Sequence, residues 1–269
     1  MSENKDKQSF WEHLDVLRIA LMKVAVVTVA FGVIAFAFKE TLFAVVLAPK
    51  GADFITYRWL SFAGELLPGG KMSDFNVQLI NTGLAEQFII HMKTALCAGL
   101  LCASPYILYQ LFRFVSPALY VNERRYAVRV VGWGYVMFLT GVAISYFLIF
   151  PLTFRFLGTY QVADDVMNMI SLQSYMSTLI LMCLAMGIVF EMPLLTWLFA
   201  KMGFITSCFL KQYRKHAIVI ILIVAAIITP TSDIFTLLLV SFPMWLLYEA
   251  SIWIIRNTSK EKITAEIAV

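Results

Sequence analysis

Long apolar runs of about twenty residues dominate this sequence and restrict how the chain can fold. The first extends from Ile19 to Phe38, and similar runs recur as far as Ile255. A helix of about 20 residues is roughly 30 Å long, which matches the hydrocarbon core of a bilayer. With 61% hydrophobic and 14% charged residues, the composition lies outside the range of soluble globular proteins. The sequence therefore predicts an all-α, polytopic membrane protein.

Polar segments containing proline and glycine separate six such runs. We expect transmembrane helices at residues 19–38, 88–112, 127–150, 172–200, 217–229 and 234–255. The fifth would reach only roughly 20 Å at 1.5 Å per residue, so the predicted bundle has a short fifth and sixth helix. Ser104 and Pro105 predict a kink whose freed carbonyl needs a partner, and Pro151 is expected to end the third span.

The whole chain, residues 1–269, is expected to form one six-span domain. Residues 1–18 form an N-terminal segment in which Phe10, Trp11, Leu14 and Leu17 predict a short amphipathic helix at the membrane surface. Residues 39–87 form a large loop on the other side, with capping helices expected at 42–47 and 60–67. Residues 112–129 form a second loop and residues 256–269 a tail.

The distribution of Lys and Arg predicts the orientation. Fourteen lie outside the spans on the face that carries both chain ends, against five on the opposite face. Because cytoplasmic loops carry the excess of basic residues, both termini and the 112–129 loop are expected in the cytoplasm, and the 39–87 loop and its helical caps outside it.

A polar island within the 112–129 loop has the composition of a recognition element. It carries Arg113, Arg124, Arg125 and Arg129 with a single acid, Glu123. The arginines can be topology signals whose repulsion Glu123 moderates. Alternatively, Glu123 is presented to an incoming cation.

Two further acids, one inside an apolar run and one beside another, are candidates for function. A carboxylate such as Glu191 costs about 3 kcal/mol inside a membrane unless it is protonated, solvated or paired. It can relay protons, contact a partner helix, or bind backbone groups freed at Pro193. Asp233, before the sixth run, can cap that helix or contact a partner.

Other functional classes lack their signatures in this sequence. No G-x-S-x-G or H-E-x-x-H motif is present, and the four cysteines have no CxxC spacing. The basic residues are dispersed between apolar runs, which does not suggest nucleic acid as a partner. We therefore expect a protein that is not an enzyme and has no metal, no cofactor and no disulfide framework.

Three motifs in order give the chain a resemblance to the TatC family of the twin-arginine protein translocase. They are SPYILYQLFRFVSPALYVNERR at 104–125, FEMP at 190–193 and ITPTSD at 228–233. The resemblance implies a receptor in the cytoplasmic (inner) membrane for signal peptides bearing paired arginines. It also implies TatA- and TatB-type single-span partners, self-association, and export of folded proteins driven by the proton gradient.

The resemblance also implies where the signal peptide binds. The family's loop acid matches Glu123, but the acid that the family has before the first span is replaced by Val16, so we expect Glu12 or Asp15 to substitute for it. Glu12 is favoured because it lies four residues before Val16, on nearly the same helical face. The expected binding set is Glu123, Glu12, Asp15, Arg18, Phe114, Pro117, Tyr120, Arg124 and Arg125.

Within the membrane, the resemblance implies a partner-contact set of Glu191, Thr229 and Asp233, with Leu237 standing where the family often has glutamine. The alternative function is a proton-coupled secondary transporter that uses Glu191. Such a transporter should show internal repeats with paired broken helices, and no convincing repeat is present in the sequence.

Overall fold

Helices make up most of the computed structural model, which describes residues 10–65, 77–115, 127–161, 163, 168–229 and 233–267. Within these ranges, five helical stretches are long and apolar enough to cross a bilayer. They are Leu14–Ala37, Glu86–Phe114, Val130–Thr159, Leu172–Lys201 and Ile234–Asn257. The chain therefore has the architecture of a helical, multi-pass membrane protein.

The elements follow one another in a simple order. The first part consists of α1 (Phe10–Ala37), α2 (Lys39–Leu47), the 3-10 turn η1 (Ala48–Lys50) and α3 (Ile55–Glu65). The middle part consists of β1 (Leu79–Ile80), α4 (Glu86–Val115), α6 (Ala127–Ile144), the π-helical turn η3 (Ser145–Ile149), α7 (Phe150–Thr159) and β2 (Ile170–Ser171). The last part consists of α8 (Leu172–Phe190), α9 (Met192–Lys201), α10 (Ser207–Gln212), α11 (Arg214–Ile228) and α12 (Ile234–Ile267).

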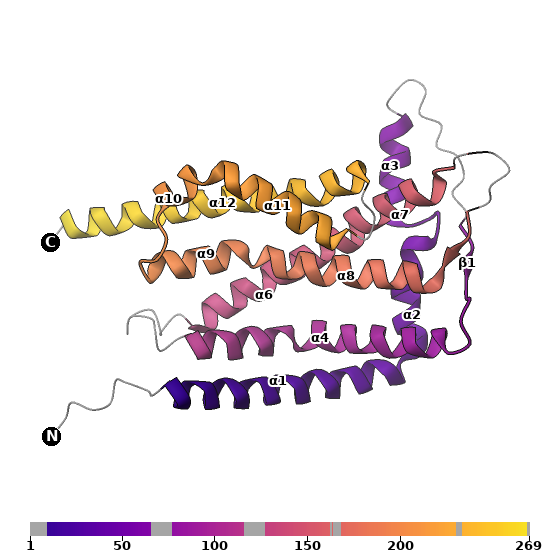
Figure 1. Ribbon diagram of the computed structural model, residues 1–269, viewed down its shortest axis with the longest axis horizontal. Helices are drawn as coiled ribbons and strands as arrows, with labels where there is room; N and C mark the ends of the chain where they lie inside the picture. The colour runs from indigo at the N-terminus through magenta and orange to yellow at the C-terminus, as the bar shows by residue number, and fades with distance from the viewer. Residues whose placement is uncertain are drawn as a thin grey trace.

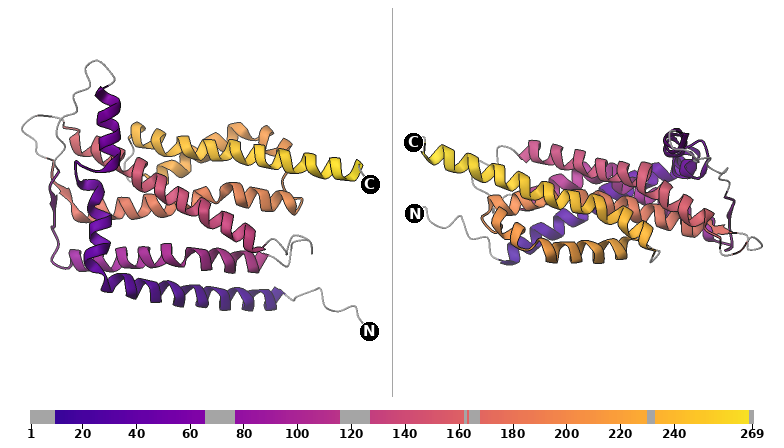
Figure 2. Two further views of the ribbon diagram at one scale, coloured as in Figure 1. Left: turned by 180° about the vertical axis from the view of Figure 1, so that it is seen from behind. Right: turned by 90° about the horizontal axis from the view of Figure 1, so that it is seen from above.

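The long helices run back and forth along the long axis of the molecule (Figure 1). Both chain ends lie at one end of this bundle, which we call the terminus end. The helices α2 and α3 lie at the other end, which we call the far end, and two further views confirm this placement (Figure 2). The two-residue strands β1 and β2 pair in parallel there, with Leu79 opposite Ile170.

The helix α1 lies at the edge of the bundle, packed along α4 (Figure 1). Glycines allow the two backbones to approach closely. A Cβ atom added to Gly99 of α4 would lie 2.5 Å from the backbone nitrogen of Gly32 and 2.6 Å from the carbonyl oxygen of Thr28. Small residues at such crossings are the usual basis of close helix packing in membranes, where the hydrophobic effect does not drive helices together.

The helix α8 supplies much of the buried core. Met176, Met182 and Met186 are fully buried along it. Glycine again sets the spacing, because a Cβ atom on Gly141 of α6 would lie 2.5 Å from the carbonyl oxygen of Met186. The crossing of α6 and α8 is therefore one part of the core, which continues into α11 and α12.

Three tyrosines attach the capping helices to the bundle at the far end. The Tyr57 hydroxyl lies 3.0 Å from the carbonyl oxygen of Pro49 and 3.1 Å from that of Pro151. The Tyr175 hydroxyl of α8 donates to the carbonyl of Val46 at 3.1 Å, and Tyr146 of η3 donates to that of Val45 at 2.5 Å. The capping helices predicted at 42–47 and 60–67 correspond to α2 and α3, although α3 begins earlier, at Ile55.

Two prolines inside helices leave carbonyls whose partners can be identified. Pro105 cannot donate to the carbonyl of Leu101, and the Ser104 hydroxyl donates to it instead at 2.7 Å. The same reasoning applies to Pro151, four residues after Phe147, whose carbonyl accepts the hydroxyl of Thr56 in α3. The freed carbonyl at Pro105 therefore finds its partner within its own helix.

Three expectations about helix boundaries are wrong. No separate amphipathic helix precedes the first span, because the sequence from Phe10 onward contains no helix breaker and α1 continues unbroken to Ala37. The third span does not end at Pro151, because this proline occupies the first turn of α7, where its missing N–H is tolerated. The sixth helix is not short, since α12 extends for 34 residues into the polar tail.

The fifth apolar run forms a short helix, as predicted. The 15 residues of α11 reach only about 22 Å. For this reason α11 is absent from the five stretches that could span a bilayer by length alone.

Candidate functional site

The predicted recognition loop joins two helices whose ends are well described. The helix α4 ends at Val115 and α6 begins at Ala127, both at the terminus end (Figure 1). The predicted binding residues between them lie outside the described residues, namely Glu123, Pro117, Tyr120, Arg124 and Arg125. The structure therefore describes the flanks of this candidate site.

The start of α1 lies beside the end of α4, because these two helices pack antiparallel (Figure 1). Asp15 and Arg18 are exposed in the early turns of α1, while Phe114 is half-buried in the last turn of α4. Glu12 belongs to the same unbroken helix, of which the side chains are described from Leu14 onward. Asp15, Arg18 and Phe114 thus share one end of the molecule.

The glutamate slot of the family pattern is an exposed apolar residue here. Val16 is 44% exposed on α1. Because residues 10–37 form one helix, Glu12 and Val16 are separated by about one turn on the same face. The choice between Glu12 and Asp15 as the replacement acid stays a prediction.

Glu191 separates α8 from α9 and is almost completely buried, with 7% of its surface exposed. Its carboxylate lies against Gly134 of α6, where an added Cβ atom would be 3.2 Å from Oε2 and 3.6 Å from Oε1. The Oε1 atom has no hydrogen-bond partner among the described residues. An acid is therefore held in a recess that exists because residue 134 has no side chain.

This geometry argues against one of the three roles considered for Glu191. Pro193 cannot donate to the carbonyl of Val189, and the backbone N–H of Glu191 donates to that carbonyl and to the carbonyl of Ile188. The carboxylate is not used for that purpose. A partner contact and a proton relay both remain compatible with its position.

Thr229 directly follows α11, and Asp233 directly precedes α12. The capping role predicted for Asp233 is confirmed, because its Oδ2 accepts the N–H of Thr236 at 2.8 Å. Thr229 is buried, and its hydroxyl donates to the carbonyl of Ala225 at 3.0 Å. Neither residue is hydrogen-bonded to Glu191 in the part of the chain that is described.

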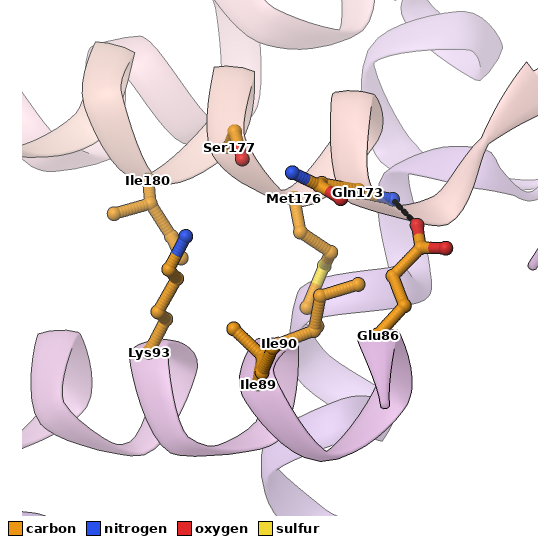
Figure 3. Close-up of a pocket in the computed structure, with 8 residues that line it drawn as sticks. All are labelled: Glu86, Ile89, Ile90, Lys93, Gln173, Met176, Ser177 and Ile180. Atoms are coloured by element: carbon orange, nitrogen blue, oxygen red, sulfur yellow. Dashed lines mark hydrogen bonds between the residues drawn. The ribbon is translucent and has the colours of Figure 1, made fainter. Parts of the chain in front are cut away.

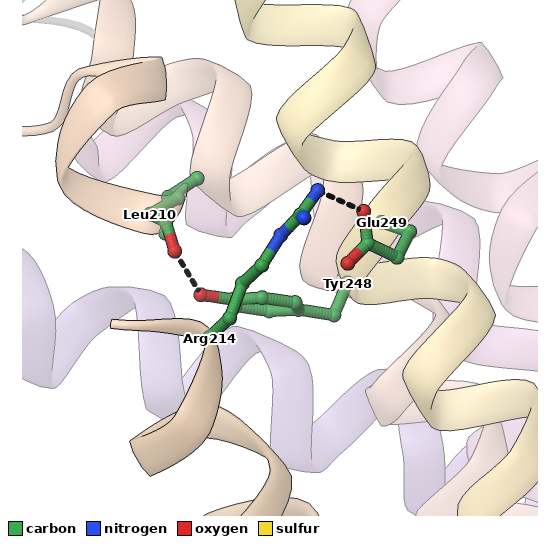
Figure 4. A network of polar contacts seen from close by, with 4 residues as sticks. All are labelled: Leu210, Arg214, Tyr248 and Glu249. Carbon is green, nitrogen blue, oxygen red and sulfur yellow. Dashed lines mark hydrogen bonds and ion pairs between the residues drawn. The ribbon is translucent and has the colours of Figure 1, made fainter. Parts of the chain in front are cut away.

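One polar network at the start of α11 was not anticipated. Arg214 forms an ion pair with Glu249 of α12 at 2.7 Å, and the neighbouring Tyr248 hydroxyl donates to the carbonyl of Leu210 at 2.7 Å (Figure 4). Together these contacts join α10, α11 and α12. An acid inside the sixth apolar run was the signal in the sequence that could have revealed Glu249.

Comparisons with known proteins agree with this arrangement. The family model of the Sec-independent protein translocase protein (TatC) matches residues 12–243. The Sec-independent protein translocase protein TatC of a Blattabacterium is 33% identical over 267 residues, covering 97% of this chain and 100% of the relative. The protein of the same name from Desulforapulum autotrophicum is 36% identical, covering 99% and 91%.

Solved structures give the same result at the level of the fold. A crystal structure described as the twin-arginine translocase receptor TatC superposes with a TM-score of 0.74 at 32% identity, covering 92% of this chain and 100% of that chain. A second crystal structure of such a receptor, in DDM, gives a TM-score of 0.75. This chain belongs to the TatC family of Sec-independent protein translocase proteins.

Proposed function

We propose that this chain is the twin-arginine signal-peptide receptor and core subunit of a translocase that exports folded proteins across the cytoplasmic membrane. One observation carries the proposal: the early turns of α1, with Asp15 and Arg18 exposed, lie beside the end of α4, where the loop whose single acid is Glu123 begins. Family membership and the likeness to a structure described as a translocase receptor support it.

The proposed mechanism is docking rather than bond chemistry. Glu123, together with Glu12 or Asp15, accepts the two guanidinium groups, because a carboxylate matches the planar donor fork of arginine and a lysine offers only a point charge. Each such charged hydrogen bond contributes roughly 1.5–3 kcal/mol. Around these acids, the surface that receives the signal peptide is formed by Arg18, Phe114, Pro117, Tyr120, Arg124 and Arg125.

A comparison of arginine with lysine tests this proposal. The full-length protein is titrated with a peptide carrying an Arg-Arg pair before an apolar run, and with its Lys-Lys version. We expect the Arg-Arg peptide to bind at least about tenfold more tightly, and Glu123→Gln to remove most of that difference. Glu40→Gln is the matched control, because Glu40 is an exposed acid at the far end. Equal binding of both peptides to the unaltered protein would overturn the receptor proposal.

A second experiment separates the two candidate replacement acids. We expect Glu12→Gln to weaken binding of the Arg-Arg peptide and Asp15→Asn to leave this binding unchanged. Adding Val16→Glu to Glu12→Gln should restore binding, since it returns an acid to nearly the same face of α1. Failure of this restoration, with Asp15→Asn abolishing binding, would assign the role to Asp15.

The proposed topology has six spans with both termini in the cytoplasm and α11 as the short fifth span. The placement of both chain ends at one end of the bundle and the excess of basic residues on that face support it. Single cysteines placed in α3 and in α10 of a chain without other cysteines should react with an impermeant maleimide from opposite sides of the membrane. Labelling of both from one side would contradict this topology.

We propose further that Glu191 receives a polar group from the helix of a TatA- or TatB-type partner, that copies of this chain associate, and that the proton motive force drives transport. The buried, unpaired Oε1 atom supports a role in binding or in proton transfer. Site-specific photo-crosslinking from Leu194, which lies beside Gly134 and the Glu191 recess, should capture a single-span partner. Capture in the unaltered protein but not in Glu191→Leu is the expected result, and capture unaffected by Glu191→Leu would refute the partner contact.

A further inference from the structure

A pocket of about 170 Å³ lies between α4 and α8, near the far end of the bundle (Figure 3). Ile90 and Met176 are buried and form its apolar floor. Lys93 extends from α4 toward α8, while Gln173 and Ser177 project from α8, and all three are exposed at its rim. The pocket lies at the start of α4, whereas the recognition loop follows the other end of that helix, so the pocket takes no part in the proposed binding of signal peptides.

The acid in this pocket is held by backbone groups. Glu86 Oε2 accepts the N–H of Gly83 at 2.7 Å, and the N–H and hydroxyl of Thr82 at 3.0 and 3.2 Å. Its Oε1 accepts the N–H of Gln173 at 3.1 Å. Three of these bonds go to Oε2 and one to Oε1, so both oxygens already accept from the backbone. Glu86 therefore joins the turn before α4 to the start of α8.

The three rim side chains, by contrast, are unused donors. In the described part of the chain, Lys93, Gln173 and Ser177 make no side-chain hydrogen bond or ion pair with another residue. An ammonium carries three donors, a carboxamide two and a hydroxyl one. Donors of this kind are complementary to an anion with several oxygen atoms.

The depth of Lys93 favours a lipid as the source of that anion. Lys93 lies seven residues into α4 from Glu86, which is about 10 Å along the helix. A lysine at that depth extends its ammonium back toward the headgroup layer. Ile89 and Met92, both about half exposed, offer an apolar path for acyl chains beside it. The pocket is too small for a partner helix, whose diameter is about 10 Å.

We propose that this pocket binds the phosphate group of a membrane phospholipid, held by Lys93, Gln173 and Ser177, with an acyl chain lying along α4. The bound lipid bridges α4 and α8 at the level where Glu86 already joins them.

Native mass spectrometry of the delipidated, full-length protein tests the site. The protein is titrated with phosphatidylglycerol, with diacylglycerol of the same chains, and with glycerol phosphate. We expect one phosphatidylglycerol to bind in preference to both other compounds. We expect Lys93→Gln to weaken that binding by about tenfold or more, Lys93→Arg to retain it, and Lys39→Gln, an exposed lysine at the start of α2, to leave it unchanged.

Several results would overturn the proposal. Phosphatidylglycerol binding that is unaffected by Lys93→Gln would show that Lys93 does not hold the lipid. Equal binding of diacylglycerol would show that the phosphate group is not recognised. Glycerol phosphate binding as tightly as phosphatidylglycerol would make this a site for a soluble phosphate. A photo-crosslinker at Ser177 that captures a polypeptide and no lipid would assign the pocket to a protein partner. If Lys93→Gln fails to fold, the proposal requires that Ser177→Ala weaken phosphatidylglycerol binding and that Lys93→Arg leave this binding intact.

Discussion

The crossing of α1 and α4 makes Gly99 the position at which one added methyl group has the largest predictable effect. A Cβ atom there would approach Gly32 N to 2.5 Å and Thr28 O to 2.6 Å, whereas ordinary contacts begin near 3.4 Å. Both neighbouring atoms belong to the backbone, so no side chain can rotate away. The helices would have to separate by about 1 Å over the crossing.

A matched substitution separates the cost of overpacking from the gain in helix propensity that accompanies any change of glycine to alanine. Overpacking of this kind costs about 1–3 kcal/mol, while replacing glycine by alanine inside a helix gains about 1 kcal/mol. Gly132→Ala in α6 is the control, because nothing lies within 4 Å of its added Cβ atom. We expect the free energy of unfolding of Gly99→Ala to be lower than that of Gly132→Ala by about 1–3 kcal/mol.

Unfolding by SDS in mixed micelles, followed by tryptophan fluorescence, measures this difference. Gly32→Ala should be tolerated, because its Cβ atom would meet α4 at an ordinary 3.6 Å. Gly99→Ala should also weaken binding of the Arg-Arg peptide. Separating α1 from α4 would separate the helix that carries Glu12 and Asp15 from the helix that leads into the loop with Glu123. Equal stability of Gly99→Ala and Gly132→Ala would refute the close-packing argument.

Three further predictions concern polar residues. Glu191→Leu should raise the free energy of unfolding by up to about 3 kcal/mol while abolishing translocation, because it removes a buried acid that has an unpaired oxygen; a destabilised but active variant would contradict this. Asp233→Ala should cost about 0.5–2 kcal/mol by removing the cap of α12, and Asp233→Asn should cost little; the two unfolding free energies provide the check. Burial raises the pKa of Tyr57, with the charge of Arg155 opposing the rise. A folded-state pKa above the unfolded value contributes stability below about pH 10 that is lost as pH rises through the folded pKa. Tyr57→Phe should therefore reduce the fall in stability measured above pH 10.

Much of the fold could be predicted because the bilayer imposes a length on every apolar run. The second, fourth and sixth apolar stretches and the short α11 follow from counting residues between polar segments, but the extension of α12 into the polar tail does not. The continuation of α7 beyond Pro151 could not be predicted in this way. It depends on η3 and on the hydroxyl of Thr56, which comes from a helix about ninety residues earlier in the chain.

The candidate site also has a part that could be predicted from the sequence and a part that could not. Glu191 could be singled out because an acid within an apolar run is costly, and Asp233 because its position matches a helix cap. The recess that holds Glu191 could not be predicted, since Gly134 lies in another helix. The roles of Glu86 and Lys93 could not be predicted either, because the pocket they line forms only where α4 packs beside α8.

The hydroxyls of Tyr57, Tyr146 and Tyr175 come from three separate elements, yet all three reach the stretch from Val45 to Pro49 or its neighbour Pro151. Tilting this region would break several such bonds at once. We therefore expect a rearrangement that preserves these bonds to leave this end in place, with the larger displacements at the opposite ends of α1, α4 and α9.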